Sequence, residues 1–97
     1  MTSMEHDVLS EITRVLIANL PVGWRRLIVD YTVRDRTASV GSGLRMADGS
    51  TLQIVVPRTL APLFSRLRNG MHVAGVGTWT TLKLTVDAPD TFTARYR

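Results

Sequence analysis

The residue types that most often perform catalysis are few in this chain and stand far apart. It has two histidines, His6 and His72, and no cysteine, so disulfides, thiolate metal sites and a cysteine nucleophile are excluded. Neither histidine has a second ligand at metal-site spacing, and no serine stands in a nucleophile-elbow motif. The sequence therefore predicts no enzyme, no metal site and no cofactor.

Two glycine runs and one pair of acids are the remaining candidates for a small-molecule site. The runs at 41–43 and 75–77 are too short for a phosphate-binding fingerprint and are typical of a strand bulge and a loop. Asp87 and Asp90 flank a proline turn, where carboxylates commonly cap backbone amides. We therefore interpret all of these residues as structural.

The composition indicates one domain covering residues 1–97. The 97 residues include 12 Lys or Arg and 8 Asp or Glu, giving a formal net charge of +4. No apolar run reaches the length of a membrane span, and the N-terminus lacks the apolar segment of a signal peptide. We therefore expect a cytoplasmic protein with no membrane partner, whose positive charge favours an acidic partner or a polyanion.

Apolar periodicity predicts two amphipathic helices. The first runs from a cap at Thr2 to about Asn19, and Glu5 stands three residues after Thr2, as a capping box requires. The second begins at a cap at Thr59 and stops at Gly70.

Alternation of apolar and polar residues predicts five strands, at about 26–34, 39–46, 52–56, 78–86 and 91–97. Tight turns are expected at 35–36, 47–50 and 87–90. Gly41 and Gly43 suggest a bulge or a close backbone approach inside the second strand. Each strand has one apolar and one polar face, so we predict an α+β two-layer sandwich of element order α-β-β-β-α-β-β, in which two helices cover one face of an antiparallel five-stranded sheet.

The outward side chains of such a sheet form one open face that is basic, rich in threonine and carries one tryptophan. These residues are Arg26, Asp30, Thr32, Arg34, Arg45, Gln53, Trp79, Thr81, Lys83, Arg95 and Arg97. Tryptophan and arginine are enriched among the anchors of protein interfaces. The expected contact surface is therefore centred on Trp79, Lys83, Arg26, Arg34, Arg45 and Arg95.

Other readings of this surface stay open. The face can be a solvated sheet surface, and Trp79 can pack against the loop at 71–77. If the face is instead a contact surface, we expect Trp79→Ala to leave the fold intact and to weaken partner binding. Trp24 is expected to close the edge of the core. The same face could bind nucleic acid through its cations. A homo-oligomer could form through open faces, or through the first or last strand as an exposed edge.

Ordered segments of the chain resemble the YezG-like family of bacterial immunity proteins. The first is Leu20–Arg26, which resembles the family's P-x-G-W followed by a strand, and the Asp48-Gly49 hairpin also fits. Further matches are Leu63-Phe64, Leu67-Arg68, Met71, Gly75, Gly77-Thr78-Trp79, Leu84-Thr85-Val86, Phe92 and Tyr96. The resemblance covers residues 8–97.

What the resemblance implies is an intracellular, non-enzymatic protein that binds and neutralises a cognate polymorphic toxin by occlusion. Inhibitors of nucleases tend to be acidic because they complement a basic groove. This chain has a formal net charge of +4. Either its toxin is therefore not a basic nuclease, or the contact uses a local acidic patch such as Glu5, Asp7 and Glu11.

Overall fold

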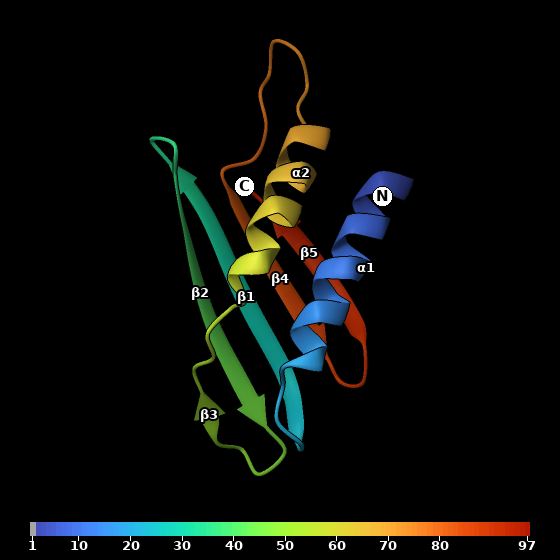
Figure 1. Ribbon diagram of the computed structural model, residues 1–97, viewed down its shortest axis with the longest axis vertical. Coiled ribbons are helices and arrows are strands. Elements are labelled where there is room, and N and C mark those ends of the chain that lie inside the picture. Colours follow the sequence, from blue (N-terminus) through green and yellow to red (C-terminus); the bar gives the residue numbers. More distant parts are fainter. Residues whose placement is uncertain (1) are drawn as a thin grey trace.

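Two helices pack on one face of a five-stranded antiparallel sheet in the computed structural model, which describes residues 2–97 (Figure 1). The elements are α1 (Ser3–Ala18), β1 (Trp24–Arg34), β2 (Thr37–Met46), β3 (Thr51–Leu52), the 3-10 turn η1 (Arg58–Leu60), α2 (Ala61–Gly70), β4 (Thr81–Asp87) and β5 (Thr91–Tyr96). The strand order is β3-β2-β1-β4-β5. The predicted α+β architecture and its element order are confirmed.

The core lies between the helices and the sheet, where every second residue of the central strands points toward α1 and α2. The buried apolar side chains are Val8, Leu9, Ile12, Leu16, Leu27, Val29, Tyr31, Leu44, Leu60, Phe64, Leu67, Trp79, Leu82, Leu84 and Val86. Phe64 of α2 stacks on Tyr31 of β1, with ring centroids 4.5 Å apart. Trp24 packs against this cluster, as expected. Burying each such side chain stabilises the fold by about 1.5–3 kcal/mol. Because the helices cover this face of the sheet, the other face of the sheet points away from them.

The first helix begins as predicted but uses Glu5 differently. The amide of Glu5 donates to Thr2 Oγ1 at 3.1 Å, which makes Thr2 the N-cap. The Glu5 carboxylate accepts a hydrogen bond from the Tyr96 hydroxyl at 2.9 Å. Burial, reinforced by this bond, raises the pKa of Tyr96 above its usual range. Glu5 therefore joins the first turn of α1 to β5.

The glycines of β2 do not form the expected bulge. Its pairing with β1 is regular from Arg26↔Arg45 to Arg34↔Thr37, and the one register shift lies between Trp24 and Arg26. No heavy atom lies within 4 Å of a Cβ built at Gly41 or Gly43, so a close approach is also absent there. The expected bulge and the expected close approach are both wrong.

The segment between β2 and α2 departs furthest from expectation. Only Thr51–Leu52 pair as a strand, and the next residues leave the sheet although Ile54 and Val56 still pack against the core. A 3-10 turn then precedes α2, so the prediction that Thr59 caps the second helix is wrong. β2 is consequently an unpaired edge over most of its length. β5 forms the other edge, as one alternative anticipated, whereas β1 is central and the expectation that it is an edge is wrong.

Trp79 does not lie on the open face, and its predicted placement there is wrong. The amides of Thr80 and Thr81 both donate to the carbonyl of Arg97, at 2.8 and 3.2 Å. Two consecutive amides on one acceptor insert an extra residue, which shifts the side-chain alternation by one. Trp79 therefore turns into the core beside Tyr31 and Tyr96 and is 7% exposed.

Candidate functional site

The sheet surface away from the helices is the candidate site, and the strand register determines its layout. Ile28 of β1 lies between Gly43 of β2 and Thr85 of β4. One step along β1, Asp30 lies between Gly41 and Lys83. Lys83 in turn lies opposite Arg95 of β5. Backbone pairing between the strands therefore fixes which side chains are nearest neighbours on this face.

An apolar recess occupies the β1–β2 side of this face. A depression of about 220 Å³ is lined by Arg26, Ile28, Gly43, Leu44, Arg45 and Thr51. Gly43 has no side chain to cover its half-buried neighbour Ile28, and a Cβ there would meet nothing within 4 Å. The recess therefore offers an aliphatic surface beside two arginines.

The two arginines of this recess differ in charge balance. Arg26 Nε donates to Asp87 Oδ1 at 2.6 Å, and Arg26 Nη2 donates to Asp87 Oδ2 at 3.3 Å. This bidentate bond raises the pKa of Arg26 and partly neutralises its field. Within residues 2–97, Arg45 has no ion pair. It keeps its full charge at the edge of the recess.

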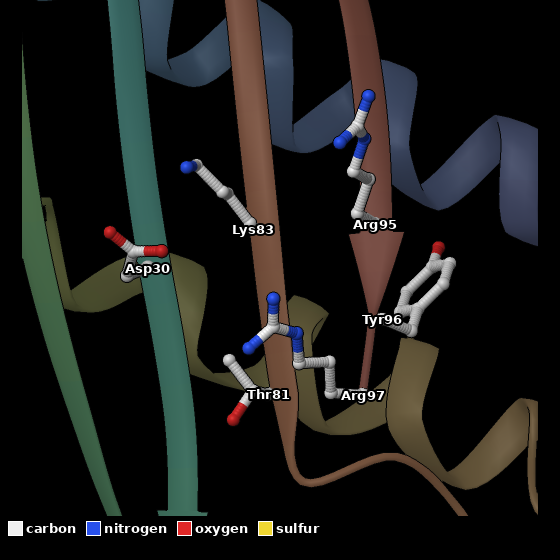
Figure 2. Close-up of a pocket in the computed structure, with 6 residues that line it drawn as sticks. All are labelled: Asp30, Thr81, Lys83, Arg95, Tyr96 and Arg97. Carbon is white, nitrogen blue, oxygen red and sulfur yellow. The ribbon is translucent and has the colours of Figure 1, made fainter.

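A second depression, of about 360 Å³, lies on the β4–β5 side (Figure 2). Its lining residues are Asp30, Thr81, Lys83, Arg95, Tyr96 and Arg97. Figure 2 views the sheet from its open face, with Asp30 on β1 beside Lys83 and the side chains of Arg95 and Arg97 across from them. A smaller hollow of about 290 Å³ shares Lys83 and Arg95 and extends past Thr85 toward Arg26. The hollows form one continuous basic surface.

Five of the six predicted contact residues lie on this face, but they do not form one cluster. Arg26 pairs in register with Arg45, and Lys83 with Arg95. Arg34 stands at the far end of β1, eight residues from Arg26, or roughly 27 Å along the strand. The sixth residue, Trp79, is in the core.

Sequence reasoning missed two features of the face. Ile28 was not among the expected residues of this face, although an aliphatic residue at an outward strand position is the signal for an apolar contact. Arg97 was left out of the contact set, although it follows Arg95 by two residues and so shares its face. The acidic patch considered on the first helix lies on the helix layer, away from this face.

The described residues contain no group of three or more His, Asp or Glu that could hold a metal ion. Among the same residues, no helix is both long and apolar enough to cross a membrane. No protein-family model and no curated protein matches this sequence.

Proposed function

We propose that this chain is a non-enzymatic binding protein whose open sheet face covers a surface of a partner protein. The observation that carries the proposal is the arrangement around Ile28, an aliphatic recess bordered by Arg26 and Arg45 on one side and by Lys83 and Arg95 on the other. An apolar centre with a charged rim is typical of protein interfaces. The cations favour a partner with an acidic surface.

A nucleic acid fits this face less well. Asp30 stands beside Lys83 near the middle of the face, and Asp87 neutralises Arg26. The Asp30 carboxylate would repel a phosphate backbone, and Arg26, already paired with Asp87, has little charge left to attract one. The burial of Trp79 also removes the tryptophan that was expected to stack bases on this face. Tyr96, which lines the second depression, is half-buried, and its hydroxyl is bonded to Glu5 of α1. A protein partner can place its own cation against Asp30 and its carboxylates against the arginines.

The resemblance of the sequence to immunity proteins supplies the biological role. We propose that the partner is a cognate protein toxin, that this chain acts in the cytoplasm of the cell that makes the toxin, and that neutralisation is stoichiometric occlusion. A basic inhibitor fits a toxin with an acidic contact surface, because opposite potentials accelerate encounter and exclude wrong partners.

The test is capture from lysate of the organism that encodes the chain, followed by a rescue assay. The purified chain is the bait, and each captured protein is expressed alone and with the chain in a bacterial host. We expect one captured domain to stop growth and co-expression of the chain to restore it. The variant Lys83→Glu/Arg95→Glu should fail to restore growth.

A matched control separates the face from overall charge. Arg14 on α1 and Arg66 on α2 are exposed on the helix layer, so Arg14→Glu/Arg66→Glu makes the same change in net charge. This variant should rescue like the wild type. The proposal fails if both variants rescue equally, if the captured proteins are harmless, or if only nucleic acid that washes off at high salt is recovered.

A further inference from the structure

Three cations that have no ion-pair partner among the described residues lie close together where β4 and β5 meet. Lys83 and Arg95 are direct cross-strand neighbours, and like charges in that relation destabilise a sheet. Arg97 follows on the same face of β5. Within residues 2–97 none of these three cations makes an ion pair, whereas Arg26 on the same face has Asp87. The arrangement is unfavourable to the isolated chain and favourable to a bound anion.

Backbone pairing fixes the spacing of the three cations. Neighbouring strands lie about 4.8 Å apart, and alternate residues of a strand about 7 Å apart. Arg97 is held at its position because its amide donates to the carbonyl of Thr81 at 2.9 Å, while its own carbonyl accepts from Thr80 and Thr81. In Figure 2 the Lys83 side chain points toward β1, that of Arg95 runs along β5, and that of Arg97 crosses β4. All three side chains are long and exposed, so rotation about their bonds can bring them to one oxyanion above the depression.

We propose that the depression bordered by Lys83, Arg95 and Arg97 is a carboxylate-binding site, which takes an Asp or Glu side chain from an acidic segment of the partner protein. This assignment rests on the proposed function. Guanidinium groups bind carboxylates through two parallel hydrogen bonds. Two arginines and a lysine can therefore fix both the position and the orientation of an acidic side chain.

Asp30 restricts what the site accepts. It lies opposite Lys83 in the register and lines the same depression, so it offsets one of the three positive charges. The remaining charge suits one or two carboxylates carried on a peptide. The hollow of about 360 Å³ also has room for the stem of an acidic side chain and the backbone that carries it.

The experiment titrates the purified full chain with a pentaglutamate peptide in low-salt buffer and follows backbone amides by NMR. We expect saturable shifts concentrated at Thr81, Lys83, Arg95 and Arg97. The variant Lys83→Gln/Arg95→Gln should weaken the apparent Kd by about tenfold or more, because it removes two charge-assisted contacts. The helix-layer control Arg14→Gln/Arg66→Gln, which has the same net charge, should bind like the wild type.

Inorganic phosphate and pentalysine are the comparison probes. Tighter saturation of the same amides by phosphate than by pentaglutamate would overturn the carboxylate assignment, as would shifts that never saturate or that persist in the double variant. Pentalysine should produce no shifts at these amides. The titration needs no partner protein, so it can fail while the rescue assay succeeds, and the two proposals fail separately.

Discussion

At the residue scale, Trp79 shows how a single side chain changes role when the strand around it is irregular. Its ring lies 6.0 Å from that of Tyr31 and 5.5 Å from that of Tyr96, between centroids. Its indole Nε1 is buried without a hydrogen-bond partner among the described residues. Trp79 is therefore a packing residue of the core and not the anchor of an interface.

The stability of two Trp79 variants tests this role. Replacing a buried tryptophan by alanine removes its burial and leaves a cavity, so Trp79→Ala should lower the free energy of unfolding by about 3–5 kcal/mol. Trp79→Phe should cost less, because it keeps most of the apolar contact and removes the unpaired indole N–H. Urea unfolding followed by far-UV circular dichroism measures both. Val22→Ala, at a fully exposed position, is the control and should leave the unfolding curve unchanged.

If Trp79→Ala has the same free energy of unfolding as the wild type, Trp79 is not part of the core and lies on the surface. The predicted placement on the surface failed because the predicted strand began at residue 78, three residues before the start of β4 at Thr81. Alternation predicts the faces correctly from Thr81 to Asp87. The extra residue at Thr80 depends on where Arg97 offers its carbonyl, and that contact between distant segments leaves no periodic signal in the sequence.

At the element scale, β2 carries a glycine where a side chain would fit. Gly43 lies in regular pairing opposite Ile28, its φ is not positive, and a Cβ there meets nothing within 4 Å. Glycine inside a strand is unfavourable by roughly 0.5–1 kcal/mol. The element would therefore be more stable with another residue, and what glycine provides is the open recess above Ile28.

The variant Gly43→Val separates strand stability from binding. It should raise the free energy of unfolding by roughly 0.5–1 kcal/mol, because valine suits a pleated strand better than glycine does. It should also weaken partner binding, since its methyl groups fill the recess beside Ile28. Thermal unfolding and the rescue assay measure the two effects. Full rescue by Gly43→Val would show that the partner does not enter the recess. Gly49→Ala, in the turn between β2 and β3, cannot serve as the control, because the φ of Gly49 is +87° and alanine would be strained there.

The hydrogen bond between Tyr96 of β5 and Glu5 of α1 predicts that the stability of the fold changes with pH in the alkaline range. Tyrosine in an unfolded chain ionises near pH 10, and the pKa of Tyr96 is raised in the folded state by burial and by its bond to Glu5. Below about pH 10 this contribution to stability is fully present, and it is lost as the pH rises from there toward the folded-state pKa. The free energy of unfolding of the wild type should therefore decrease above pH 10.

Tyr96→Phe isolates that contribution. At neutral pH the variant should be less stable by about 1 kcal/mol, because one hydrogen bond to a carboxylate is removed. Above pH 10 its stability should decline less steeply than that of the wild type, measured by urea unfolding at several pH values. Parallel declines in the two proteins would assign the alkaline loss to other groups.

The elements of this fold follow from sequence to very different degrees. Both helices and the four longer strands could be predicted, because one face of each is buried and its period is therefore visible. The end of the third strand could not be predicted. Ile54 and Val56 follow β3 in an irregular segment but still pack against the core, so their spacing resembles the alternation of a strand. The cap of α2 was missed for a similar local reason, because the chain enters the helix through a 3-10 turn in place of a side-chain cap.

At the scale of the whole molecule, the buried core and the proposed contact surface lie on opposite faces of the sheet. The helix-facing side of the sheet holds almost all of the buried apolar residues, whereas the open side holds the lysine and arginines opposite one another. The sequence predicted this division and most of the cations on the open face. It did not predict which cations are neighbours, because strand order and register decide that.

One substitution should move stability and binding in opposite directions across these layers. Arg95→Glu turns the like-charge pair with Lys83 into an opposite-charge pair, which should stabilise the sheet by about 0.2–1 kcal/mol. The same change places a carboxylate where the partner's acidic side chain is proposed to bind, so pentaglutamate binding and rescue should both be lost. Thermal unfolding at low and high salt measures the first effect, and the stabilisation should shrink as salt screens the pair. If Arg95→Glu lowers stability instead, Lys83 and Arg95 do not repel each other in the free protein, and the charge imbalance that argues for an anion site is absent.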